Sequence, residues 1–197
     1  MKKTAKTGDP LKQLPDALKL AVLRNHARPS RFILVVSVAA QRMVLFEKSS
    51  RQSGESRFPE YDFRQRYVVS TSRFGIGQVM HSNRTPLGLH RIAQKVGGGH
   101  PVGTVFKARK PVGMMWDEGQ QDNSIVHRIL WLEGLEPGLN RGGNVDTFRR
   151  YVYIHGYGDE STLGRPQSCG CIHVSAAELV PLYERLPVGT LVWIARR

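Results

Sequence analysis

The sequence predicts a mainly β protein with two short helices. Its apolar residues gather in short runs rich in Val, Ile, Leu and Phe, which is the composition of strands. The 20 glycines and 11 prolines are spread fairly evenly, which suits many short strands joined by turns. Helical spacing of apolar residues occurs near the start of the chain and near its end. The 197 residues, 40% of them hydrophobic, are enough for one domain with a core and a small appendage.

The first 30 residues predict a helical extension on the outside of the main domain. Asp9 followed by Pro10 is a suitable helix start, because aspartate caps a helix and proline fits its first turn; Pro15 offers a second start. Apolar residues then recur at helical spacing, at Leu11, Leu14, Leu18, Ala21 and Val22. We therefore expect a helical extension over residues 1–30 and a main domain over residues 31–197.

The main domain opens with two predicted strands within residues 31–49, joined by a short turn at residues 40–42. The polar residues 49–64 predict a long surface loop. Further strands are expected at residues 66–72, 87–96, within 102–119, and at 124–132, 151–154 and 191–194.

A short helix is predicted between the last two of these strands. Ser175 and Glu178 have the spacing of a capping box, in which the serine caps the helix and the glutamate bonds back. The helix is expected to run to about Leu186. Pro181 lies inside it and lacks a backbone donor, so a kink or a break is expected there.

The charge of the chain is strongly positive, with 29 Lys and Arg residues against 16 Asp and Glu residues and a formal net charge of +13. Nucleic acid, an anionic membrane and an anionic cell wall are all candidate surfaces for such a chain, and a merely solvated basic surface is the alternative. No zinc finger, helix-turn-helix or aromatic RNA-binding signature accompanies the charge. We therefore expect no specific nucleic-acid partner.

No stretch of the sequence predicts a membrane span. The apolar run at residues 32–40 is much shorter than the roughly 20 residues that a spanning helix requires. Residues 1–6 are basic, but residues 7–20 are polar and interrupted by prolines, so no secretory signal is visible. We expect a soluble protein, and no feature of the sequence indicates an oligomeric state.

The sequence also predicts no metal and no cofactor. It contains no H-E-x-x-H and no C-x-x-C, and four of its histidines are scattered, at His81, His90, His100 and His127. The tryptophans, Trp116, Trp131 and Trp193, lie in or beside apolar runs, so we expect them in the core rather than at a ligand site.

The candidate chemistry lies between residues 151 and 175. His155 is at the end of a predicted strand, and sixteen positions later Cys171 lies in a turn with Ser168, Cys169 and Gly170. A thiol near a histidine can be drawn toward thiolate, so the two residues predict a nucleophile and its base. We expect a hairpin-like return of the chain to bring them together.

Gly170 allows the backbone to turn tightly, and the amides of Gly170 and Cys171 can then face an oxyanion. Cys169 and Cys171 are too close in sequence to hold distant parts of the chain together, so they are reactive or incidental. A buried small hydrophobe is the alternative for a lone loop cysteine. A reversible disulfide between the two cysteines, which would block the nucleophile, is a further alternative.

These motifs closely resemble the L,D-transpeptidase (YkuD-like) family of cell-wall enzymes. The resemblance rests on I-H-G around His155 and on S-x-G-C-I-x-x-S around Cys171. It extends to the first hairpin, to RYVVSTSRFG followed by RTPLGLHRI, to ILWLEGLEPG and RRYVYIHG, and to LYERLPVGTLVWI. It therefore covers roughly residues 31–194.

The resemblance implies a catalytic domain built as a bent β-sandwich or barrel, with a short helix after the cysteine and an N-terminal helix before it. Cys171 would attack an L-to-D peptide bond in a peptidoglycan stem peptide, D-alanine would leave, and a thioester would form. An amine of a neighbouring stem would resolve the thioester into a cross-link, whereas water would make the enzyme an L,D-carboxypeptidase. Carbapenem β-lactams would be covalent inhibitors. Such a substrate places the protein in the cell envelope or periplasm.

The resemblance also implies roles for individual residues. His155 would be the general base, the amides around Gly170 and Cys171 the oxyanion hole, and Ser168 a further member of the catalytic turn. The implied substrate-binding positions are Gly156, Tyr157, Arg165, His173 and Cys169.

Three positions depart from the family's usual pattern. Cys169 stands where the family usually has histidine, His173 where it has arginine, and Tyr157 where it has threonine. Without the arginine fork, a grip on a carboxylate by a partly charged His173 would be weaker and pH-dependent. Arg165 could meet such a carboxylate, with a solvated loop arginine as the alternative. A catalytically weakened member that binds peptidoglycan, or a thiol-regulated variant, is the alternative function.

Overall fold

The computed structural model describes residues 12–51, 58–117 and 124–197. Its strands are β1 (Phe32–Ser37), β2 (Arg42–Lys48), β3 (Tyr61–Ser70), β4 (Gly88–Val96), β5 (Thr104–Lys107), β6 (Lys110–Met114), β7 (Ile125–Gly134), β8 (Tyr153–Tyr157), β9 (Ile172–Val174) and β10 (Leu191–Ala195). Its helices are α1 (Asp16–Arg24) and α2 (Ala176–Arg185), with the short 3-10 turns η2 (Gly143–Val145) and η3 (Glu160–Thr162).

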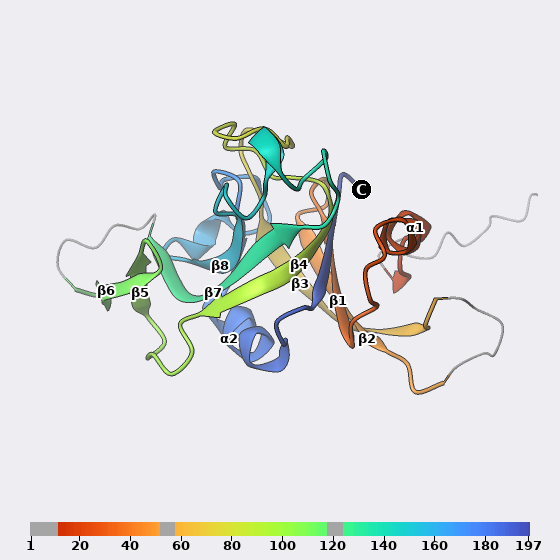
Figure 1. Cartoon of the computed structure of the whole chain (residues 1–197). Helices are drawn as coiled ribbons and strands as arrows, with labels where there is room; N and C mark the ends of the chain where they lie inside the picture. Colours follow the sequence, from red (N-terminus) through yellow and green to blue (C-terminus); the bar gives the residue numbers. More distant parts are fainter. Residues whose placement is uncertain (1–11, 52–57, 118–123) are drawn as a thin grey trace, which may run out of the picture.

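The strands form one sheet in the order β4-β10-β1-β2-β3-β9-β8-β7-β5-β6. β4 also pairs with β7, so every strand except β5 and β6 belongs to a closed ring. The β5–β6 hairpin projects from this ring on one side, and α1 lies on the opposite side (Figure 1). The prediction of a mainly β, barrel-like fold is therefore confirmed.

Two hydrophobic cores hold the sheet to its helices. The larger core lies inside the ring, where α2 contributes Leu179 and Leu182. The smaller core lies on the outer side of β1, β2, β4 and β10, where α1 contributes Leu18 and Val22. Each helix thus buries one apolar stripe and leaves its other face to solvent.

β1 is buried along its whole length because it faces both cores. Leu34 and Val36 belong to the larger core, whereas Ile33 and Val35 belong to the smaller one. Successive side chains of a strand point to opposite faces, so a strand covered on both sides is apolar throughout. This explains the uninterrupted apolar run in the sequence.

α1 begins at Asp16 with Pro15 as its N-cap, so the second of the two predicted starts is correct. Asp9 and Pro10 lie outside the described residues, and the division of the chain at residue 30 stays a prediction.

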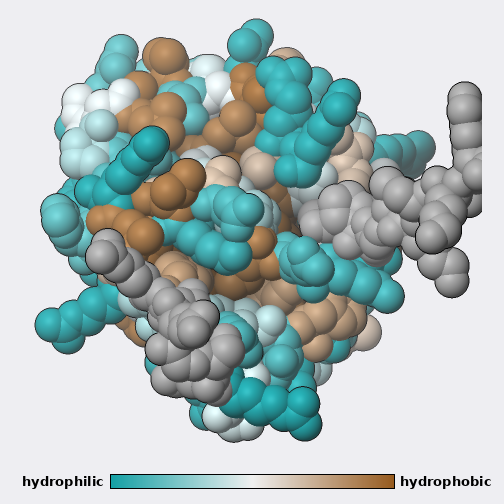
Figure 2. Space-filling model, turned by 90° about the vertical axis from the view of Figure 1, so that its right-hand side faces the viewer, coloured by the Kyte–Doolittle hydropathy of each residue, from teal (hydrophilic) through white to brown (hydrophobic). Residues whose placement is uncertain are grey.

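Leu20 and Leu23 on α1 are 50% and 48% exposed. Figure 2 faces this side of the molecule and shows hydrophobic patches among hydrophilic side chains. Within the described ranges, no helix has the length and apolarity to cross a membrane.

The other predicted strands are present. The surface loop predicted over residues 49–64, however, extends too far along the chain. β3 begins at Tyr61, so the prediction is wrong for residues 61–64. The first half of β3 is polar and mostly exposed, and therefore lacks the apolar run that marks a strand. Glu47 of β2 joins this half to its neighbours by accepting bonds from Arg31, Arg64 and Arg185.

α2 differs from its prediction in two ways. It is one helix from Ala176 to Arg185 with Pro181 inside it, so of the predicted kink or break the break is absent. Ser175 is the N-cap, yet its hydroxyl donates to Glu178 Oε2 at 3.2 Å instead of capping the backbone. Glu160 of η3 caps the helix in its place, because its Oε1 accepts from the Ala176 amide at 2.6 Å.

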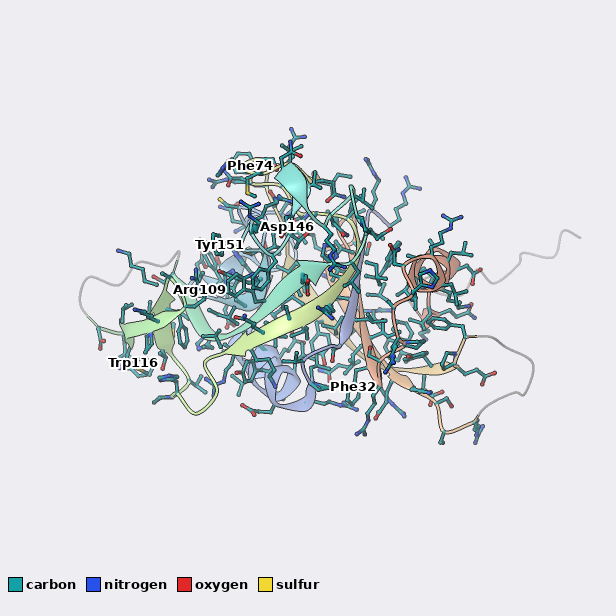
Figure 3. The ribbon with its side chains drawn as sticks, viewed as in Figure 1. Phe32, Phe74, Arg109, Trp116, Asp146 and Tyr151 are labelled. Atoms are coloured by element: carbon teal, nitrogen blue, oxygen red, sulfur yellow. The ribbon has the colours of Figure 1, made fainter. Side chains whose placement is uncertain are left out.

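The tryptophans do not share one environment. Trp131 is 7% exposed and Trp193 is half-buried, as expected for core residues. Trp116 is 69% exposed beyond the end of β6, so its predicted place in the core is wrong. β6 is the last strand of the sheet order, and Trp116 lies beyond its end, at the open end of the projecting hairpin and away from its turn (Figure 3).

Candidate active site

β8 and β9 bring the two halves of the candidate site together. They pair in parallel, with Ile154 opposite Ile172, His155 opposite His173 and Gly156 opposite Val174. The predicted hairpin-like return is therefore wrong, because a hairpin would make the strands antiparallel. β9 itself was not predicted, since its three residues are too few for a periodic pattern.

The candidate residues face outward from the ring. Ile154 and Ile172 belong to the core inside the ring, so their neighbours His155 and His173 point to the opposite face. Cys171, just before β9, packs on that outer face against a cluster of Phe106, Ile129, Trp131 and Tyr153. Cys171 and His155 thus lie on the same side of the sheet, two residues apart in the register of β8 and β9.

His155 is buried and held in one orientation. The residue is only 3% exposed, and the Nδ1 atom of its ring lies 2.7 Å from the carbonyl oxygen of Gly156. A carbonyl only accepts, so Nδ1 carries the proton and Nε2 keeps a lone pair. Burial lowers the pKa of His155 to about 4, against the opposing effect of the Gly156 carbonyl. The imidazole is therefore neutral at pH 7 and has the tautomer of a base.

Cys171 is partly exposed and lines a cavity of about 140 Å³. Its Sγ accepts from the Tyr153 amide at 3.4 Å and donates to the Tyr151 carbonyl at 3.6 Å. Dense packing raises the pKa of the thiol to about 11, although the Tyr153 amide and Arg150 oppose this rise. No hydrogen bond joins the thiol to His155 among the described residues, so the resting pair is a neutral thiol and a neutral imidazole.

The turn before Cys171 is shaped by Ser168 and Gly170. Ser168 Oγ donates to the Cys171 carbonyl at 2.6 Å and accepts from the Gly170 amide at 3.2 Å. Gly170 has φ +117°, and a Cβ there would lie 3.3 Å from the Arg84 carbonyl, so the position favours glycine. The Gly170 amide is thus already bonded, whereas the Cys171 amide has no acceptor in the part of the chain that the structure describes.

Arg150 belongs to the site although no pattern in the sequence selects it. It lines the same cavity as Cys171, and its guanidinium donates to the carbonyls of Gly77 and Arg84 and to the hydroxyl of Ser82. These bonds hold the loop between β3 and β4 against the cavity. An arginine just before a strand has no spacing signal, and only the tertiary contacts reveal it.

His173 has no charge to offer a carboxylate at neutral pH. It is 4% exposed, stacks on Tyr157 with ring centroids 4.1 Å apart, and meets His155 edge-on at 4.8 Å. Burial, and secondarily His155, hold its pKa far below the usual range, so the expected partial charge at neutral pH is wrong. A role of His173 in substrate binding would then rest on shape rather than charge.

The remaining predicted site residues differ in whether they line the cavity of Cys171. Cys169 is exposed and lines the same cavity as Cys171. Gly156 allows β8 to approach β7 closely, because a Cβ there would lie 2.5 Å from His127 Cδ2. Arg165 is exposed and is not among the residues that line this cavity.

The chain matches the model of a known family, described as the L,D-transpeptidase catalytic domain, over residues 31–194. No curated protein matches it. The suspected resemblance to L,D-transpeptidases is thereby confirmed.

Solved structures with a similar fold share little sequence with this chain. Bd1075 of Bdellovibrio bacteriovorus has a TM-score of 0.50 at 15% identity, over 85% of this chain and 49% of its own. An L,D-transpeptidase from Mycobacterium smegmatis has a TM-score of 0.48 at 14% identity, over 84% and 58%. L,D-transpeptidase 3 from Mycobacterium tuberculosis, solved with a faropenem-derived adduct, has a TM-score of 0.48 at 16% identity, over 83% and 60%. The chain therefore spans about half to three fifths of these proteins.

Proposed function

The chain belongs to the L,D-transpeptidase catalytic domain family, and from this premise we propose that it is a cysteine acyltransferase acting on peptidoglycan stem peptides. Cys171 is the nucleophile and His155 is the general base. The observation that carries the proposal is the fixed tautomer of His155, whose Nε2 lone pair lies on the same face of the sheet as the thiol.

In the first step, the sulfur of Cys171 attacks the carbonyl carbon of the L-to-D peptide bond while His155 Nε2 takes the thiol proton. The thiol pKa of about 11 and the imidazole pKa of about 4 disfavour a resting ion pair. The proton therefore moves as the S–C bond forms, which is general-base catalysis. The C–N bond then breaks, His155 returns the proton to the leaving amine, and D-alanine departs from a thioester.

The oxyanion of the tetrahedral intermediate needs donors beside the sulfur. The Cys171 amide is the donor that the turn supplies, while Ser168 occupies the Gly170 amide and fixes the peptide plane between them. Ser168 is in this proposal a positioning residue, and a substrate oxygen could replace its hydroxyl as acceptor for the Gly170 amide.

The thioester is resolved by a second nucleophile. An amine of a neighbouring stem peptide, deprotonated by His155, gives a cross-link, whereas water gives a shortened stem and makes the enzyme an L,D-carboxypeptidase. Either reaction places the working protein at the cell envelope, where its substrate lies, and the net charge of +13 favours contact with an anionic wall.

Intact mass spectrometry after incubation with a carbapenem such as imipenem tests this proposal. We expect one covalent adduct on the wild-type protein and on Cys169→Ala, and none on Cys171→Ala. The same pattern is expected for the thioester formed with a disaccharide-tetrapeptide. An adduct that survives Cys171→Ala would move the nucleophile elsewhere and defeat the mechanism.

A weakened member that binds peptidoglycan is the second candidate, and one observation favours it. The thiol bonds to the backbone of Tyr151 and Tyr153, with no bond to the proposed base in the described residues. Such a protein would be retained on isolated sacculi in a salt-sensitive way, equally well with Cys171→Ala. It would form no adduct in the mass experiment, which separates the two candidates.

A further inference from the structure

A second cavity, of about 430 Å³, adjoins the cavity of Cys171. The two cavities share four lining residues, Met80, His81, Arg149 and Tyr151. The second adds Trp131 and Phe148, which stack with ring centroids 4.1 Å apart, and Arg109 from the β5–β6 hairpin. A ligand that reaches the thiol can therefore extend from one cavity into the other.

The turn between β5 and β6 carries Arg109 to the edge of this aromatic wall. Ala108 and Arg109 have φ of +49° and +67°, a conformation that residues other than glycine rarely adopt. The Cζ atom of Arg109 lies 5.0 Å from the ring centroids of both Trp131 and Tyr151. Figure 3 shows Arg109 and Tyr151 beside one another. Two such residues between the paired Lys107 and Lys110 form the tight turn of a two-residue hairpin, which holds the Arg109 side chain over the cavity.

The lining of the second cavity is basic. It contains Arg109 and Arg149, and no aspartate or glutamate is among its residues. Neither arginine forms an ion pair with a carboxylate of the described residues, and the polar neighbour of Arg109 is the hydroxyl of Tyr153. A guanidinium has five N–H donors, so one that rests on aromatic rings and meets a single hydroxyl keeps further donors for a planar anion, which it can bind through two parallel bonds.

We propose that Arg109, over the rings of Trp131 and Tyr151, is a specificity-determining residue that binds a carboxylate of the stem peptide at a distance from the scissile bond. This inference rests on the proposed function for the identity of the peptide. Arg109 supplies the positive charge that the buried His173, at the position where the family usually has arginine, does not. The carboxylate recognised here is separate from that of the leaving D-alanine, which lies next to the thiol.

Equilibrium binding measured by calorimetry tests the proposal in the Cys171→Ala protein, which cannot turn the peptide over. Two stem tetrapeptides serve as probes: one with all its carboxylates free, and one in which every carboxylate except that of the terminal D-alanine is a carboxamide. Arg109→Gln is expected to weaken binding of the first peptide about tenfold and to leave the second unchanged. Arg109→Lys should fall between, because lysine keeps the charge and loses the planar fork.

Lys110→Gln is the matched control, because it removes the same charge from the neighbouring residue, which lines neither cavity. It should leave binding of both peptides unchanged. The proposal is overturned if Arg109→Gln binds the free-carboxylate peptide as tightly as its parent does, if both peptides lose affinity equally, or if Lys110→Gln has the same effect.

A negative result for Arg109 can be distinguished from a failure of the proposed function. With Cys171 intact in a Cys169→Ala background, alkylation by the uncharged reagent iodoacetamide should proceed equally with and without Arg109→Gln, which shows that the fold and the Cys171 thiol are preserved. If the wild-type thiol forms no adduct with stem peptide or carbapenem, the catalytic proposal fails, while the difference in peptide binding still decides the role of Arg109.

Discussion

His155 and His173 lie directly opposite one another in the parallel pairing of β8 and β9, with ring centroids 4.8 Å apart and ring planes at 63°. Both histidine rings are buried, and the Tyr157 ring stacks on that of His173. Burial is the main cause that lowers the pKa of His173. A positive charge on His155 lowers it further. His173 is thus an uncharged ring in contact with the proposed base.

Restoring the family's usual arginine with His173→Arg is expected to destabilise the protein. The new guanidinium would lie among buried rings, beside His155 and without a carboxylate partner. An uncompensated buried charge of this kind typically costs about 3–5 kcal/mol of unfolding free energy. Urea denaturation at pH 7 measures the loss, and His173→Asn, polar but uncharged, should cost less. Equal stability of His173→Arg and wild type would show that the pocket opens to solvent.

The reactivity of Cys171 should rise steeply with pH. Because burial raises the pKa of this thiol to about 11, only a small fraction is thiolate at pH 7. In a Cys169→Ala background, the rate of alkylation by iodoacetamide should increase about tenfold per pH unit between pH 7 and 10. A rate that already levels off near pH 8 would mean that a thiolate–imidazolium pair exists at rest.

His90 should make the protein sensitive to acid. It is fully buried, with Nδ1 3.0 Å from the Gly88 carbonyl and Nε2 3.2 Å from Thr147 Oγ1, and burial lowers its pKa from 6.5 to about 4. The unfolded chain therefore takes up a proton at a higher pH than the folded one. The stability that this group contributes is present above pH 6.5 and is lost as the pH falls toward 4, by about 2.5 kcal/mol at pH 4.5.

Urea denaturation of His90→Gln at pH 7 and at pH 4.5 measures this contribution. The variant is less stable at pH 7, but the difference between the two pH values should shrink by about 2.5 kcal/mol relative to wild type. His26→Gln, at an exposed position, should leave the difference as it is. If the difference in unfolding free energy between pH 7 and pH 4.5 is the same in His90→Gln as in wild type, the acid sensitivity belongs to other groups, such as His155 and His173.

The elements that the sequence predicts well are those whose own side chains carry the pattern. β1, β2 and β7 bury long apolar runs, so their composition alone marks them as strands. The first half of β3 is polar because it is exposed, and β9 has only three residues that become a strand by pairing with β3 and β8. Both depend on partners distant in sequence.

The same distinction applies to the site. His155 and Cys171 could be selected because their residue types and glycine neighbours indicate a chemistry. Arg150 and Arg109 could not, since arginine is common in this basic chain and nothing in its spacing tells a solvated side chain from one that lines a cavity. The charge state of His173 also escaped prediction, because it follows from burial beside Tyr157 and His155.

Arg150 should affect the site through two separable properties, its hydrogen bonds and its charge. Its bonds to the carbonyls of Gly77 and Arg84 hold the loop between β3 and β4 over the cavity, and its charge lowers the pKa of Cys171. Arg150→Lys keeps the charge but cannot make the forked set of bonds, whereas Arg150→Gln loses both.

Both variants of Arg150 should form the imipenem adduct more slowly, by about tenfold for the lost bonds, and should show faster hydrogen exchange in residues 77–84. Only Arg150→Gln should also slow alkylation of Cys171 by iodoacetamide at pH 9, because loss of the positive charge raises the thiol pKa further. Arg141→Gln, an exposed position on the neighbouring loop, controls for net charge. If Arg150→Lys and Arg150→Gln alkylate at the same rate, the guanidinium acts on the loop alone and its charge does not reach the sulfur.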